Sequence, residues 1–135
     1  GNYKKPTIIN KEHLLYISEL IKDVKFIRLD FNESMKNIKN NDFTYLDPPY
    51  YPTNSKSFVK YNKKGFNINN HNQLFKNCKE LYKNKNKFIM SNSSASYVTD
   101  YFKDICKIDM IDCKRRINSK KPGSTAKEVI ISNFD

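Results

Sequence analysis

The stretch DFTYLDPPY, from Asp42 to Tyr50, carries the pattern that most strongly indicates the fold. Its first half is rich in apolar and aromatic residues and predicts a short strand. Pro48 and Pro49 end that strand, because proline has no N–H to donate to a neighbouring strand. Asp47 therefore stands at the carboxyl end of a strand, which is where open α/β sheets bind their ligands.

Predicted helices and strands alternate on both sides of this stretch. Apolar residues at helical spacing predict helices over residues 12–24 and 69–82, and residues 32–40 and 95–102 fit two further helices. Strands are predicted over residues 25–30, 42–46, 87–91, 105–114 and 127–132. Asn10 is the expected N-cap of the first helix, and residues 51–67 read as a long loop, which in a compact domain is usually functional or mobile. The alternation favours one α/β domain with a mostly parallel sheet and crossover helices.

The charge balance is strongly basic. Lys and Arg number 25 against 14 Asp and Glu, which gives a formal net charge of +11. Such an excess slightly favours a polyanionic partner, because dispersed Lys and Arg neutralise phosphates. Asn/Lys-rich stretches such as residues 83–87 offer another explanation, since the codons of an AT-rich genome produce them without selection for binding.

The cysteines and histidines show no metal-site or disulfide pattern. Cys78, Cys106 and Cys113 form no CxxC pair and leave an odd number, so neither a disulfide framework nor a zinc site is expected. His13 and His71 are far apart in the sequence. We expect His13 on a helix face and His71 near a helix start, neither with a chemical role. No secretory signal and no apolar run of membrane-spanning length occurs, which favours a cytoplasmic location, in a bacterium or in the host of a virus.

The residues from Asp47 to Tyr50 could grip a planar amine. A residue before proline is held extended, and two successive prolines fix their φ angles while leaving their carbonyls as acceptors. The Asp47 carboxylate and the Pro48 carbonyl can each accept one amine hydrogen, which lets the nitrogen lone pair point at an electrophile, while the Tyr50 ring stacks on the attached base. A base in a duplex must be flipped out to reach such a pocket. Alternatively, the four residues are only a turn after a strand.

Several motifs in order make the sequence similar to the DNA adenine methylase family, the D12 class of N6-adenine-specific DNA methyltransferases. They are Asp30-Phe31, the Asp47–Tyr50 motif followed by Phe58, Tyr61 and Phe66, Ser91-Asn92, Arg115-Arg116 and the stretch from Glu128 to Asn133. The first six residues, GNYKKP, resemble the end of the segment that follows the family's target-recognition region. The ordered set is far more specific than the tetrapeptide alone, and it spans almost the whole chain.

This resemblance implies methyl transfer from S-adenosyl-L-methionine to N6 of adenine in DNA, on a partial Rossmann-like methyltransferase sheet and without a metal. The catalytic residues would be Asp47, Pro48, Pro49 and Tyr50. The methyl donor would contact Asp30, Phe31 and Asp47. The DNA would contact Tyr50, Lys60, Tyr61, Arg115 and Arg116, although the two arginines could equally be sheet-edge charges. Tyr51, directly after the motif, looks unexceptional.

One departure from the family pattern bears on completeness. The family's donor pocket depends on a Phe-x-Gly-x-Gly loop, whereas the glycines here are Gly1, Gly65 and Gly123, and no two are close. We therefore expect the chain to be the C-terminal part of a split, processed or truncated enzyme, active only with an N-terminal fragment or chain. A non-catalytic nucleic-acid-binding relic or structural subunit is the alternative. An enzyme acting on RNA, on cytosine N4 or on a protein glutamine is a third possibility.

Overall fold

The computed structural model describes residues 9–53, 65–114 and 125–134. Its elements, in chain order, are the helices α1 (Lys11–Leu20) and α2 (Phe31–Lys36), the strand β1 (Phe43–Leu46), the helix α3 (Ile68–Lys83), the strand β2 (Lys87–Ser93), the helix α4 (Ser96–Phe102) and the strands β3 (Lys107–Lys114) and β4 (Thr125–Ser132). The predicted helices and four of the predicted strands are therefore present, with shifted ends.

Side chains that accept hydrogen bonds set the starts of three helices. The Asn10 side chain accepts from the His13 N–H, which confirms Asn10 as the N-cap of α1. Asp30 caps α2 in the same way, through the Asn32 N–H. At α3, Asn67 and Asn70 cap each other reciprocally in a capping box.

The prediction of a mostly parallel sheet is wrong. The four strands of the described residues lie in the order β1-β2-β4-β3, and among them only β1 and β2 are parallel. β4 pairs antiparallel with both β2 and β3. The reason lies in the connections: α3 provides the crossover that parallel strands need, but only the ten residues 115–124 separate β3 from β4. The fold is a mixed α/β structure in which one parallel unit is joined to an antiparallel pair.

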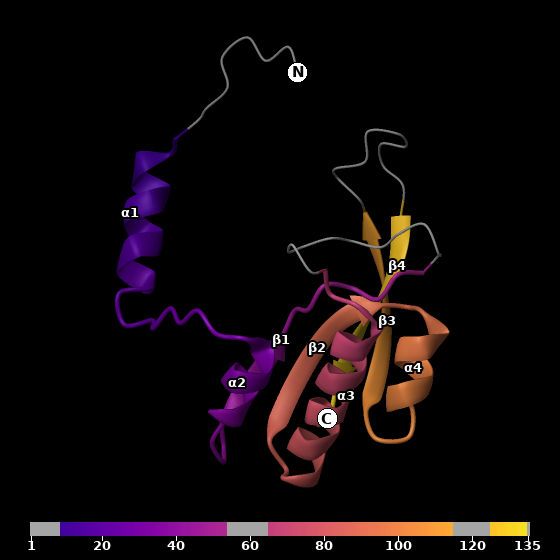
Figure 1. The fold of residues 1–135 in the computed structure, drawn as a ribbon. Helices are drawn as coiled ribbons and strands as arrows, with labels where there is room; N and C mark the ends of the chain where they lie inside the picture. Colours follow the sequence, from indigo (N-terminus) through magenta and orange to yellow (C-terminus); the bar gives the residue numbers. More distant parts are fainter. Residues whose placement is uncertain (1–8, 54–64, 115–124, 135) are drawn as a thin grey trace.

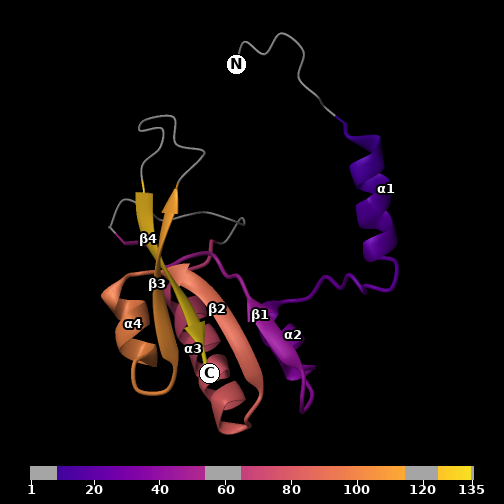
Figure 2. The same ribbon diagram turned by 180° about the vertical axis from the view of Figure 1, so that it is seen from behind.

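The core lies between one face of this sheet and the helices α3 and α4, which cover the same face (Figure 1). Fully buried side chains from β2 and β4 meet those from the two helices, namely Phe88, Met90, Val129 and Ile131 against Leu74, Phe75, Cys78, Val98 and Phe102. None of the described helices crosses the opposite face of the sheet (Figure 2). Of the described helices, none is long and apolar enough to cross a membrane.

The first 22 described residues differ from the rest, because every one of residues 9–30 is exposed. α1 stands apart from the sheet (Figure 1), and residues 24–30 form no strand, so the strand predicted over residues 25–30 is wrong. Phe26 and Ile27 are 78% and 71% exposed. The apolar pattern reports a tendency to extend, but a strand also needs a hydrogen-bonding neighbour, and no described strand pairs with this segment.

Candidate active site

The motif Asp47–Tyr50 leaves β1 at its carboxyl end, beside the carboxyl-terminal half of β2. The register of the parallel pair places Leu46 opposite Met90, so Asp47 and Ser91 follow side by side. The Ser91 hydroxyl donates a hydrogen bond of 2.7 Å to Asp47 Oδ1. Asp47 as a whole is exposed, although the Ser91 that binds it is buried. One carboxylate oxygen is thus held by the sheet, while the residue remains accessible to a ligand.

Tyr50 lies half-buried at the other end of the motif. Its hydroxyl is 3.5 Å from Glu128 Oε2 on β4, at the limit of a hydrogen bond. Burial raises the pKa of the Tyr50 phenol, and the carboxylates of Glu128 and Asp47 raise it further, against an opposing effect of Ser91. The phenol therefore stays neutral, and its ring can serve as an uncharged stacking surface.

Tyr51, which looked unexceptional in the sequence, is firmly anchored. Its N–H donates a hydrogen bond of 2.9 Å to Asn92 Oδ1, which also accepts from the Ser93 N–H at 2.8 Å. Its ring stacks on Tyr97 of α4, with 4.4 Å between ring centroids and 19° between ring planes. Sequence reasoning used Ser91 and Asn92 only as marks of resemblance. Their position, two polar residues at the carboxyl end of a buried strand, was the signal that could have identified them.

His71, expected near a helix start, lies there and belongs to this aromatic cluster. It is buried in the first turn of α3, and burial lowers the pKa of its imidazole to about 4. Its ring meets those of Phe66 and Tyr51 at 4.7 and 5.2 Å between centroids. The imidazole is therefore neutral near pH 7 and packs as part of an otherwise uncharged core.

The two residues expected at the methyl donor lie at the start of α2. Asp30 is exposed, and one of its carboxylate oxygens is already used to cap the helix, which leaves the other free to accept. Phe31 is half-buried with its ring 5.5 Å from that of Phe66. No ring contact or hydrogen bond joins either residue directly to Asp47 or Tyr50 within the described residues. The connection runs instead through the rings of Phe66, His71 and Tyr51.

These residues supply part of what an adenosyl ligand needs, namely a carboxylate acceptor and an aromatic face. They do not supply a glycine-lined loop. Gly65 is the one glycine among the described residues. No cluster of three or more His, Cys, Asp or Glu side chains in the described part of the chain could hold a metal ion. Four residues expected to contact DNA, namely Lys60, Tyr61, Arg115 and Arg116, lie outside the described residues, as does Phe58.

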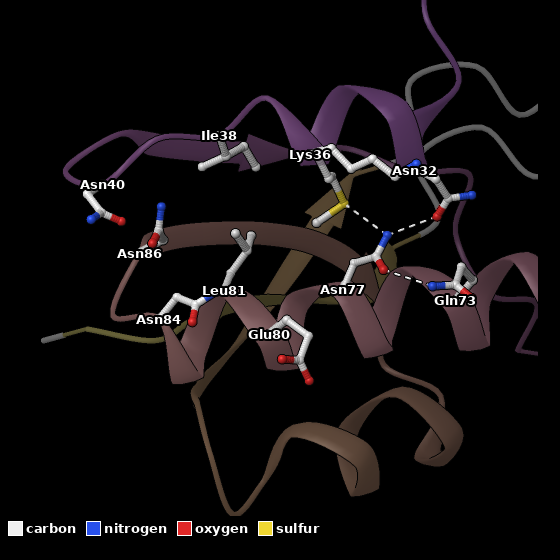
Figure 3. Close-up of a pocket in the computed structure, with 11 residues that line it drawn as sticks. Asn32, Lys36, Ile38, Asn40, Gln73, Asn77, Glu80, Leu81, Asn84 and Asn86 are labelled. Carbon is white, nitrogen blue, oxygen red and sulfur yellow. Dashed lines mark hydrogen bonds between the residues drawn. The ribbon is translucent and has the colours of Figure 1, made fainter.

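A separate cavity of about 580 Å³ lies between α2 and α3, on the helix-covered side of the sheet. Most of its polar lining consists of amide side chains, and Asn77 links two of them: it donates to Asn32 at 2.9 Å and accepts from Gln73 at 2.8 Å (Figure 3). None of its lining residues belongs to the motif Asp47–Tyr50. The cavity therefore marks the seam between two helices and is not the candidate active site.

Comparison with known proteins identifies the family. Residues 1–117 match the family described as D12 class N6 adenine-specific DNA methyltransferase. The Type II methyltransferase M1.LlaDCHI of Lactococcus lactis subsp. cremoris is 34% identical over 140 residues, which cover 99% of this chain and 48% of that protein. The Type II methyltransferase M.MjaIII of Methanocaldococcus jannaschii is also 34% identical over 140 residues, covering 99% and 47%. The chain thus spans about half the length of these curated relatives, and it belongs to the D12 class of N6 adenine-specific DNA methyltransferases.

Proposed function

We propose that the chain is the C-terminal part of a methyltransferase catalytic domain that methylates N6 of adenine in DNA. The observation that carries this proposal is the state of Asp47: an exposed carboxylate at the end of β1, steadied on one oxygen by Ser91 and followed by two prolines. A carboxylate that served only to stabilise the turn would not need one oxygen bound by Ser91 and the other left accessible.

Each residue of the motif has a distinct task in this proposal. Asp47 accepts one hydrogen of the adenine amino group through its free oxygen, and the Pro48 carbonyl accepts the other. Pro49 keeps the backbone rigid, and the Tyr50 ring stacks on the purine. S-adenosyl-L-methionine supplies the methyl group when bound. The residues lower the barrier mainly by orientation and by fixed acceptors, without a strong general base, because the amine can lose its proton after methyl transfer.

The methyl donor requires more than the described residues offer. Asp30 and Phe31 would contact its adenosine, and Asp47 would lie beside it. The remaining contacts would come from an N-terminal fragment or chain, because the relatives are about twice as long as this chain. Two features of β1 support such a neighbour: it is an edge strand of the described sheet, and its residues Phe43 and Tyr45 are 58% and 61% exposed. A partial Rossmann-like sheet would be completed at that edge.

DNA is the proposed substrate. The target adenine would be flipped out of the duplex, because the motif can grip its amino group only when the base is unpaired. The formal net charge of +11 supports binding to the phosphate backbone, and Tyr61, Lys60, Arg115 and Arg116 would contribute through the resemblance described above.

The test is methyl transfer from labelled S-adenosyl-L-methionine to duplex DNA, by an enzyme in which this chain is joined to a donor-binding N-terminal segment. Asp47→Ala should lower the rate roughly 100-fold or more, because it removes an acceptor that acts in the transition state. Asp109→Ala is the matched control, since Asp109 is an exposed aspartate on β3, paired with Lys107 at 3.3 Å, and away from the motif. Full activity after Asp47→Ala would contradict the proposal.

A non-catalytic nucleic-acid-binding protein is the second candidate, and the basic charge is the observation that favours it. It predicts salt-dependent binding to any duplex and no methylation even with the N-terminal segment supplied. Parallel assays on RNA and on a protein substrate, together with identification of the methylated base in DNA, would reveal the third possibility, an enzyme acting on RNA, on cytosine N4 or on a protein glutamine.

A further inference from the structure

Two adjacent residues of β2 hold the chain on both sides of the Asp47–Tyr50 motif. Ser91 donates to the side chain of Asp47 at 2.7 Å, and Asn92 accepts from the backbone of Tyr51 at 2.9 Å. Side chains of successive strand residues point to opposite faces of a sheet, so the two contacts grip the motif from different sides. The turn is therefore fixed at its entrance and at its exit.

Two helices complete the anchor at the exit. Tyr97 of α4 stacks on the Tyr51 ring, and its hydroxyl donates to the side chain of Asn72 on α3. His71 of α3 meets the Tyr51 ring edge to face, at 5.2 Å and 70°. Tyr51 thus contacts three elements that belong to the rigid core, and we call Asn92, Tyr97 and His71 the Tyr51 clamp.

The clamp and the neighbouring Ser93 bury three polar side-chain atoms. His71 Nδ1, Asn92 Nδ2 and Ser93 Oγ are buried and have no hydrogen-bond partner among the described residues. Two of these atoms belong to clamp residues, and the third belongs to the residue after Asn92. Burying these atoms is costly, and at Asn92 the cost is offset by the hydrogen bonds that its Oδ1 accepts from the backbone N–H groups of Tyr51 and Ser93.

We propose that Tyr51 is a positioning residue of the active site, and that the Tyr51 clamp orients Asp47 and Tyr50 toward the amino group of the target base. The proposal rests on the proposed function. The φ angles of Pro48 and Pro49 are fixed and the residue before each proline is held extended, but the ψ of Pro49 is not restricted in this way, so the direction of Tyr50 depends on where the next residue is held. A displacement of about 1 Å at a reacting centre can cost roughly 100-fold in rate, so an anchor of this kind has a measurable effect.

The experiment compares Tyr97→Ala, which removes the stacking ring, with Tyr97→Phe, which keeps it. Tyr101→Ala is the matched control, because Tyr101 lies on the same helix and contacts Phe75 and Phe102 but not Tyr51. On this chain alone, NMR measures amide hydrogen exchange at Tyr51 and the chemical shift of Asp47. Joined to a donor-binding segment, each variant is assayed for kcat and KM with labelled S-adenosyl-L-methionine and duplex DNA.

Tyr97→Ala should expose the Tyr51 amide to exchange, shift the Asp47 resonance and lower kcat roughly tenfold or more, with a smaller change in KM. Tyr97→Phe should restore all three values, and Tyr101→Ala should leave them near those of the unaltered chain. Equal effects of Tyr97→Ala and Tyr101→Ala, or an unchanged Asp47 resonance in Tyr97→Ala, would overturn the proposal. Asp47→Ala keeps the two hypotheses apart: if it abolishes activity while Tyr97→Ala does not lower kcat, the clamp fails and the proposed function stands.

Discussion

The neutral, buried imidazole of His71 should make the stability of the chain depend on pH. Its pKa is lowered from 6.5 to about 4, and burial is the cause. Between these two pH values the unfolded chain binds a proton at this histidine and the folded chain does not. Stability is therefore fully present above about pH 6.5, and it is lost as the pH falls toward about pH 4. The interval between the two pKa values, at about 1.36 kcal/mol per pKa unit, corresponds to about 3 kcal/mol.

His71→Phe removes the titrating group and keeps an aromatic ring in the cluster. Among the described residues whose rings contact His71, Tyr51 is the one titratable group, since Phe66 and Phe75 carry no charge at any pH. Replacing His71 therefore leaves the other titrations of the chain largely unchanged. His13→Phe is the matched control, because His13 is the other histidine and lies exposed on α1.

Urea unfolding of the three proteins, from about pH 7.5 down to about pH 4, measures the effect through the free energy of unfolding. Acidic side chains titrate in all three proteins, so the informative quantity is the difference between each variant and the unaltered chain. For His71→Phe that difference should change by about 3 kcal/mol across the range, in favour of the variant at low pH. For His13→Phe it should stay level. A level difference for His71→Phe would refute the assignment of a buried neutral imidazole.

Two further predictions concern the core. Phe75→Ala should lower the free energy of unfolding in urea by about 3–5 kcal/mol, because Phe75 is fully buried against Phe102. Phe43→Ala, at a position 58% exposed, should lower it by less than about 1 kcal/mol. Similar losses for both variants would contradict the packing of α3 on the sheet. Cys78 should react with iodoacetamide at least roughly tenfold more slowly than the half-buried Cys113, because Cys78 is fully buried and burial raises the pKa of its thiol to about 12. Mass spectrometry of the labelled chain measures both rates. Fast labelling of Cys78 in the folded state would contradict its burial on α3.

The sequence was sufficient to predict the elements but not how they pair. Apolar spacing located α1 and α3, the expected short helices at α2 and α4 are present, and the Asn10 cap was correct. The sequence could not reveal that β4 lies between β2 and β3, because the position and direction of a strand depend on the connections and on partner strands far away in the chain. The predicted strand over residues 25–30 failed for the same reason, since its apolar residues have no ladder to join among the described strands.

At the site, the motif itself and the family were within reach of sequence reasoning, and the family match confirms the resemblance. The supporting residues were not. Asn92 and Tyr97 lie 41 and 46 positions after Tyr51, and only the fold shows that they meet it. His71 lies four residues before Phe75 on α3, so helical spacing could have placed it on the buried face, but only the fold shows that it meets Tyr51.

The place of β4 in the middle of the sheet has a consequence for biosynthesis. Ribosomes release the chain from its amino end, so β2 and β3 emerge with their facing edges unsatisfied and wait for the last strand, residues 125–132, to arrive. The partner of the Tyr50 hydroxyl, Glu128, comes with that same strand. Sheet closure and completion of the candidate active site are therefore late, simultaneous events, and a nascent chain stalled before Thr125 has neither.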